Sequence, residues 1–171
     1  LYSLSVGQRT IAYAWLYSRD AAVNNIGGLL LLEDELDFQL MEKSIRLIVE
    51  KSDALRLRIV KKMPILFPEQ VLITEALKQY FSDDCDVPVD FVDFSGKTME
   101  EMDDTVLRWN AKPVDIFGGW LCRFTMVKAP DGRQGVYAKI DHLATDAWMS
   151  MLLCREIMGV YYALKKGEEP E

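Results

Sequence analysis

One short segment of the sequence carries residue types that acid–base chemistry needs. It runs Asp141-His142-Leu143-Ala144-Thr145-Asp146-Ala147-Trp148 and contains the only histidine of the chain. An imidazole has an unperturbed pKa of about 6.5, so it can take up or release a proton near neutral pH. Asp146 follows His142 by four residues. It can cap a helix that begins at Ala147, or it can hold the loop through an arginine, and either role would position His142.

The periodicity of the apolar residues predicts the elements on both sides of this segment. Two alternating apolar runs, residues 120–128 and 133–141, are joined through Pro130-Asp131-Gly132 and predict a β-hairpin. An amphipathic helix is expected over residues 147–164. His142 then lies where a strand passes into a loop that leads to a helix, a place that suits reactive groups. A lone histidine there is more often structural, so the segment by itself leaves both roles open.

In the rest of the chain, segments with the helical period of about 3.6 residues alternate with segments that have the strand period of two. Helices mix with strands around one clear hairpin, which predicts an α/β sandwich with a mixed sheet. A capping box at Thr98 marks the start of one of the helices. Further helices are expected from Ser5 to about Tyr17, over residues 38–51 and over residues 75–81, and further strands over residues 24–33, 54–60, 71–73 and 89–94.

Composition and charge exclude several classes of protein. The chain has 171 residues, of which 50% are hydrophobic and 27% are charged, as in one globular domain. The net charge is −7, and no basic cluster exceeds a pair of lysines, so we expect neither nucleic acid nor an anionic membrane as a partner. The longest apolar run, residues 26–32, is too short to cross a bilayer.

The cysteines indicate neither a metal site nor a disulfide framework. Cys85, Cys122 and Cys154 are widely spaced and there is one histidine, so we expect no metal. The sequence shows no signal peptide, and an odd number of cysteines fits a reducing compartment, so we expect a cytoplasmic protein. No glycine-rich phosphate loop follows a predicted strand.

The segment around His142 resembles the H-H-x-x-x-D-G motif of nonribosomal peptide synthetase condensation domains. Other segments resemble further motifs of that family and occur in the same order along the chain. They are residues 4–15 (S-x-x-Q-x-x-x-x-x-W), residues 51–56 (R-H-E-x-L-R), residues 92–96 (V-D-L-S and the turn after it), and residues 112–115 with 119–123 (R-P-F-D and G-P-L-x-R).

The resemblance implies a fold and a reaction. The fold is that of chloramphenicol acetyltransferase, a two-layer sandwich with a mixed sheet and flanking helices, of which residues 1–164 would be the N-terminal lobe and residues 165–171 a disordered or linker tail. The reaction is transfer of an acyl or aminoacyl group from a carrier-protein phosphopantetheine thioester to an acceptor amine. His142 would be the catalytic residue, and its imidazole would either take a proton from the amine or orient the amine through the tetrahedral intermediate. No cofactor is bound directly. The expected partners are carrier-protein domains and the absent C-terminal lobe.

The chain also departs from the family pattern. Asp141 stands where the motif has its first histidine, and Ala147 stands where it has glycine. Arg56 and Arg123 are candidates for an ion pair with Asp146, which we expect to point away from the substrate side. Two other functions stay open: a stand-alone acyltransferase of the same superfamily that uses coenzyme A thioesters, and a degenerate lobe that serves as a scaffold. In either case we expect the isolated lobe to be inactive and to self-associate.

Overall fold

The computed structural model describes residues 1–18, 22–62, 76–117 and 119–170. Its larger sheet has four strands in the order β2-β7-β6-β5, with β2–β7 and β6–β7 antiparallel and β5–β6 parallel. The predicted hairpin is therefore confirmed, as is the mixed sheet. Gly132 in its turn has a φ of 90°, a conformation that favours glycine. The strands are β2 (Asn25–Leu32), β5 (Val89–Asp93), β6 (Cys122–Lys128) and β7 (Gln134–Asp141).

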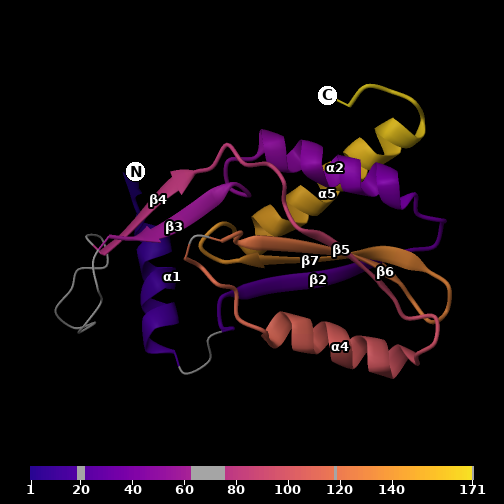
Figure 1. Cartoon of the computed structure of the whole chain (residues 1–171), viewed down its shortest axis with the longest axis horizontal. Coiled ribbons are helices and arrows are strands. Elements are labelled where there is room, and N and C mark those ends of the chain that lie inside the picture. Colours follow the sequence, from indigo (N-terminus) through magenta and orange to yellow (C-terminus); the bar gives the residue numbers. More distant parts are fainter. Residues whose placement is uncertain (19–21, 63–75, 118, 171) are drawn as a thin grey trace.

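Helices cover both faces of this sheet (Figure 1). On one face lie α2 (Phe38–Lys51) and α5 (Ala147–Lys165), and α4 (Met99–Ala111) lies on the other. The helices predicted to begin after Thr98 and Asp146 do so, because each of these residues accepts a hydrogen bond from a main-chain N–H group of the first turn. Asp37 caps α2 in the same way. The larger apolar core is between the sheet and the α2–α5 pair.

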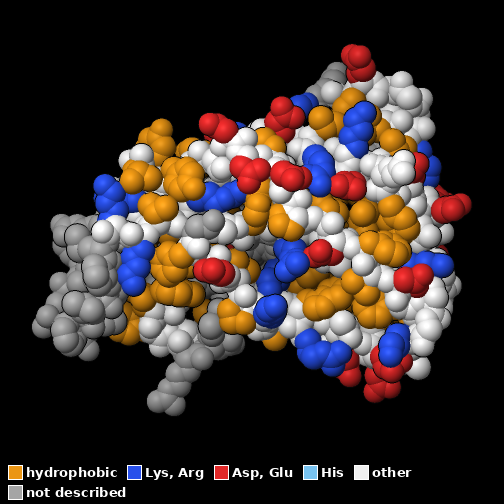
Figure 2. Space-filling view, viewed as in Figure 1, with side chains coloured by type: hydrophobic (Ala, Val, Ile, Leu, Met, Phe, Trp, Pro, Cys, Tyr) orange, Lys and Arg blue, Asp and Glu red, His pale blue; other side chains and the backbone are white. Residues whose placement is uncertain are grey.

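A second, three-stranded sheet was not predicted as a separate unit. Its order is β1-β4-β3, all antiparallel, and α1 (Val6–Tyr17) packs against it through an apolar core of its own. Figure 2 shows apolar side chains gathered over β3 and β4. The strands are β1 (Tyr2–Ser3), β3 (Leu57–Lys61) and β4 (Leu77–Phe81).

Three predictions about local structure need comment. The helix predicted over residues 75–81 is wrong, because Leu77 and Gln79 are buried alternately as β4 pairs with β3. The strand predicted over residues 71–73 lies outside the described residues. The strand predicted over residues 24–33 is correct, but the expectation that it is buried is wrong: β2 is an edge strand, none of its residues is fully buried, and Leu30 is 44% exposed.

Candidate active site

His142 directly follows the last residue of β7, a central strand of the larger sheet. Its main-chain N–H donates to the carbonyl of Asn24 at 2.8 Å, and Asn24 immediately precedes β2. The buried Asn24 side chain donates in turn to the carbonyl of Ile11 in α1 at 3.2 Å. The backbone of His142 is therefore tied to the edge strand and, through it, to the first helix, while its side chain is half-buried.

Asp141 holds the turn that presents His142. It is only 2% exposed, and its carboxylate accepts the N–H of Leu143 at 2.9 Å, while its own N–H donates to the carbonyl of Leu121 at 2.7 Å. A carboxylate that accepts from the backbone two residues later is a known way to fix a turn. Asp141 stands where the family motif has its first histidine, and its bonds hold the turn in shape.

Burial raises the pKa of the Asp141 carboxyl. The bond from Leu143 and the electrostatic effects of His142 and Lys139 act in the opposite direction, but burial is the largest cause. The carboxyl is therefore harder to ionise in the folded lobe than in the unfolded chain.

Asp141→Asn is expected to remove a pH dependence from the stability of this chain. An acid with a raised pKa holds more protons when folded, so the free energy of unfolding falls as the pH rises from the ordinary carboxyl pKa to the raised one. The amide keeps an oxygen that can accept from Leu143 but carries no charge. Denaturant unfolding of both proteins across this window measures the effect. A stability difference that stays constant with pH would contradict the prediction.

Gln8 joins three elements at the other side of the same turn. Its Oε1 accepts from the N–H of Ser5 at 2.9 Å in a capping box, while its Nε2 donates to Gln79 Oε1 at 2.8 Å and to the carbonyl of Leu143 at 3.0 Å. These bonds fasten α1 and β4 to the residue after His142. The sequence showed Gln8 only as part of a resembling motif and assigned it no role.

Asp146 is the N-cap of α5. Its carboxylate accepts the N–H of Met149 at 2.7 Å, so the capping alternative is the one the structure shows. Asp146 is exposed and lines the same open cavity as His142, and the expectation that its carboxylate points away from the substrate side stays a prediction. Ala147, the first residue of α5, is exposed.

The two candidate arginines bind other carboxylates. Arg56 pairs with Asp53 at 2.7 Å and also donates to the carbonyl of Ser82, and Arg123 pairs with Asp90 at 2.8 Å. Among the residues that the structure describes, no arginine forms an ion pair with Asp146. The pairing of Arg56 or Arg123 with Asp146 is therefore corrected: Arg56 bonds within its own turn, and Arg123 joins β6 to Asp90 on β5.

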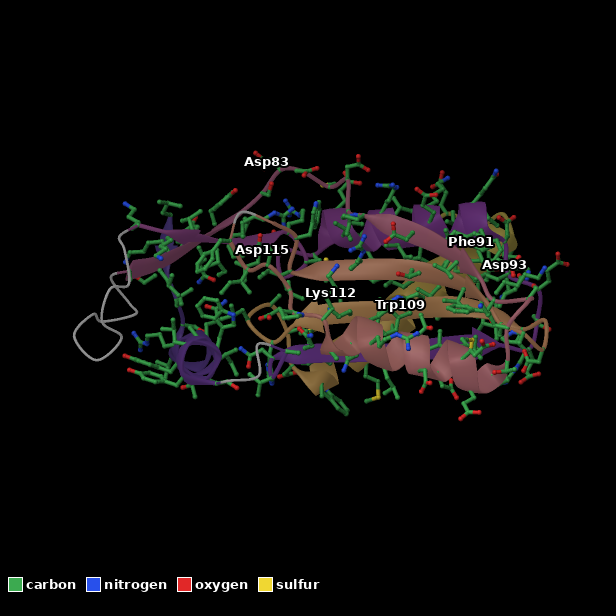
Figure 3. The ribbon with its side chains drawn as sticks, turned by 60° about the horizontal axis from the view of Figure 1, so that its bottom comes forward. Asp83, Phe91, Asp93, Trp109, Lys112 and Asp115 are labelled. Carbon is green, nitrogen blue, oxygen red and sulfur yellow. The ribbon has the colours of Figure 1, made fainter. Side chains whose placement is uncertain are left out.

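The end of α4 is fixed to β7 two residues before Asp141. Lys139 is buried, and its ammonium donates to the carbonyl of Trp109 at 2.8 Å and also to that of Lys112. Figure 3 shows Trp109 and Lys112 at this end of α4, against the sheet. A cation is stabilised at a helix C-terminus, while burial lowers the pKa of Lys139. The strand that carries the site is thereby held on its α4 face as well.

His142 and Asp146 border an open cavity of about 800 Å³. Its walls come from α1, from the β3–β4 sheet and from the turn after β7. The lining mixes amide and hydroxyl groups with apolar side chains, and it includes Gln8, Gln79, Thr145, Leu57 and Phe81. A cavity of this kind can admit a flexible, partly polar chain to the imidazole.

The described residues offer no group of three or more His, Cys, Asp or Glu side chains that could hold a metal ion. In the same part of the chain, no helix is long and apolar enough to cross a membrane.

Comparison with known proteins gives one consistent result. The family model described as "Condensation domain" matches residues 1–171. A linear gramicidin synthase protein of Brevibacillus parabrevis is 26% identical over 172 residues, which cover 98% of this chain and 2% of that protein. Surfactin synthase subunit 1 of Bacillus subtilis (strain 168) is 24% identical over 174 residues, covering 98% of this chain and 4% of that protein. The chain thus spans a small part of each of these two relatives.

Solved structures show the same fold. The starter condensation domain of rhizomide synthetase superposes with a TM-score of 0.82 at 20% identity, covering 99% of this chain and 41% of that one. The first condensation domain of the calcium-dependent antibiotic synthetase, solved with a substrate analogue, gives a TM-score of 0.81 at 19% identity, and the match covers 99% of this chain and 39% of that one. The chain therefore spans about two-fifths of each of these solved chains.

Proposed function

The chain belongs to the condensation-domain family, and from this membership we propose that it is the histidine-bearing lobe of an amide-forming acyltransferase in nonribosomal peptide synthesis. The donor is an acyl or aminoacyl thioester on the phosphopantetheine arm of a carrier-protein domain, and the acceptor is an amine. One observation carries the proposal: His142 lies on a turn held by bonds to three other parts of the fold, at the margin of an open cavity.

The proposed step is direct transfer. The acceptor nitrogen attacks the thioester carbonyl carbon, a C–N bond forms, and the imidazole of His142 accepts the proton that the nitrogen loses. The tetrahedral intermediate then collapses, the C–S bond breaks, and the sulfur leaves as the thiol with the proton that the imidazolium of His142 gives back. No acyl group is attached to the protein in this scheme. The role of the turn is to hold the imidazole where donor and acceptor meet.

The cavity beside His142 supports a substrate delivered on a long arm. Its volume of about 800 Å³ is within the range of about 300–1,000 Å³ for small-molecule sites. It is open, and its lining includes polar groups on α1 and β4, such as Gln8 and Gln79, that can bond the amides of an extended chain. The arm belongs to the substrate, and these residues would orient it.

The proposed reaction is tested by offering the full-length protein two kinds of donor. Single-turnover assays with loaded carrier proteins and an amine acceptor should give the amide. If only a coenzyme A thioester reacts, and with an alcohol acceptor, the chain is instead part of a stand-alone acyltransferase. If neither donor reacts in any combination, the lobe is a scaffold.

The proposed partner on the open side is a second lobe. The chain covers 39% and 41% of the two solved condensation-domain chains described above, and the first turns of α5 expose a group of large apolar side chains. They are Trp148 at 67%, Met149 at 44% and Met151 at 58% exposure. Contiguous apolar surface of this kind commonly marks an interaction site.

The isolated lobe is therefore expected to self-associate as its concentration rises. Sedimentation should show a shift from monomer to larger species, because the exposed side chains of α5 are buried between copies. Replacing Trp148 and Met151 with glutamine should return the monomer. A clean monomer at high concentration in the unmodified lobe would show that this surface needs no partner.

A further inference from the structure

A second cavity, of about 400 Å³, lies beside the C-terminal end of α4. Its floor is part of the α4 face of the larger sheet, where two neighbouring cross-strand pairs of β6 and β7 carry polar side chains. The pairs are Arg123–Lys139 and Thr125–Tyr137. Val127, two residues further along β6, belongs to the apolar core beneath α4, so this face of the sheet changes from apolar to polar at the end of the helix.

Three cations converge on this cavity. Arg123 and Lys139 are directly opposite each other on antiparallel strands, and like charges in that position destabilise a sheet. Lys112, which ends α4, lines the same cavity. Burial is the largest cause that lowers the pKa of the Lys139 ammonium, and the charges of Lys112 and Arg123 lower it further. The three side chains therefore repel one another, and Figure 2 shows Lys and Arg side chains gathered between the sheet and this end of α4.

The lining neutralises only one of these charges. Arg123 pairs with Asp90 of β5 at 2.8 Å, and Asp90 is the one carboxylate among the residues that line the cavity. The ammonium of Lys112 forms no ion pair with a described residue. Lys139 donates to two carbonyls, of Trp109 and Lys112, which uses two of the three N–H groups of its ammonium. Two positive charges are therefore left without a counter-charge.

The end of α4 does not cancel this excess. Carbonyls at a helix C-terminus carry partial negative charge, which disfavours an anion. Here the carbonyls of Trp109 and Lys112 accept from Lys139, and that of Asn110 accepts from the side chain of Asn25. These donors offset the negative end of the helix and fix the Lys139 ammonium in the floor.

A phosphate monoester fits both the charge and the shape of the cavity. It carries about −1.5 to −2 charges near neutral pH, and its oxygens accept several hydrogen bonds. Arginine and lysine are the side chains that bind such a group. The volume of about 400 Å³ leaves room for more than the phosphate. The rings of Trp109 and Tyr137, whose centroids are 5.4 Å apart, also line the cavity and offer an aromatic surface to the organic part of the ester.

We propose that this cavity binds a small phosphate monoester, with its phosphate on Lys112, Arg123 and Lys139 and its organic part against Trp109. The site is independent of the proposed acyl transfer, because no described residue lines both this cavity and the one at His142. The phosphate supplies the counter-charge that the lining lacks.

The first test uses pyridoxal 5′-phosphate, a phosphate monoester on a flat ring that carries an aldehyde. The aldehyde forms an imine with a nearby lysine amine, with loss of water, and borohydride then reduces the imine to a stable label. In the full-length protein, peptide mapping should find Lys112 or Lys139 labelled at least tenfold faster than Lys97, an exposed lysine outside the cavity. Pyridoxal, which lacks the phosphate, should show no such preference.

Phenyl phosphate and inorganic phosphate identify the source of the anion. Phenyl phosphate should protect the lysines of the cavity at a lower concentration than inorganic phosphate does, because its ring contacts Trp109. Equal protection by the two would overturn the assignment to an ester and leave the free ion as the ligand.

Two variants break the same ion pair and should act in opposite directions. Arg123→Gln removes a cation from the floor and should weaken protection by phenyl phosphate about tenfold, as expected for one hydrogen bond to a charged group. Asp90→Asn removes the one carboxylate of the lining and should strengthen that protection. Both variants lose the bond between Arg123 and Asp90, so a purely structural role of the pair would change protection in the same direction in both.

Three results would overturn the proposal. One is equal labelling of Lys97 and the lysines of the cavity, and another is labelling that phenyl phosphate does not slow; in either case the cations only hold the end of α4. The third is a full-length protein in which Lys112 and Lys139 do not react, because another part of the protein would then cover the cavity. None of these readouts involves amide formation, so each leaves the proposed reaction intact.

Discussion

His142→Ala in the full-length protein is expected to lower the rate of amide formation by about 10²–10⁴-fold. The imidazole is the only histidine of this lobe, and the structure places it on a turn fixed from several directions. Its removal takes away the group that accepts the proton of the acceptor amine. The loss should fall mainly on kcat, since the contribution arises in the transition state and not in substrate binding. Single-turnover transfer between loaded carrier proteins measures it.

The matched control for this substitution is Asp141→Asn. It changes the neighbouring residue but keeps an oxygen that can accept the N–H of Leu143, so the turn and the imidazole stay in place. Its loss of rate should be much smaller than that of His142→Ala. An unaltered rate in His142→Ala would show that His142 is not the base.

The lobe without the rest of the protein is expected to show no measurable acyl transfer. A base helps only when donor and acceptor are held in line with it, and positioning can supply about 7–11 kcal/mol of the barrier. The cavity at His142 is open on the side that we propose a second lobe to cover. The measurement is single-turnover transfer with equal concentrations of this chain and of the full-length protein. A rate within tenfold of the full-length value would show that this lobe alone positions both substrates.

Local signals in the sequence were enough to predict the frame of the site. The turn at Gly132 fixed the hairpin, and Asp146 marked the start of α5, because each depends on residues close together in the chain. We predicted a helix where β4 lies, because the alternation of buried and more exposed residues that identifies this strand becomes visible only once β4 is paired with β3. The arginine partners of Asp146 were assigned by resemblance, and the structure gives Arg56 and Arg123 nearer carboxylates.

The parts of the site that were not predicted depend on register between distant segments. Gln8 reaches the carbonyl of Leu143 across 135 residues, and no local pattern indicates that contact. The apolar cavity between α5 and the larger sheet is lined by Gly28 and Ala138, whose pairing becomes known only once β2 and β7 are aligned. Both residues are unremarkable in the sequence, since a glycine in a strand and an alanine in a hairpin each have many explanations.

The bonds that hold the turn after β7 also determine when the site comes into being. His142 is hydrogen-bonded to Asn24, Asp141 to Leu121 and Leu143 to Gln8. Most of these hydrogen bonds join residues that are far apart in the sequence. Contacts of high sequence separation form late in folding and open only with the unit that contains them. During synthesis the complete turn therefore exists only after β7 has left the ribosome and met the strands already made. We expect the amide protons of Asp141 and His142, which bond to Leu121 and Asn24, to exchange with solvent only when these long-range contacts open.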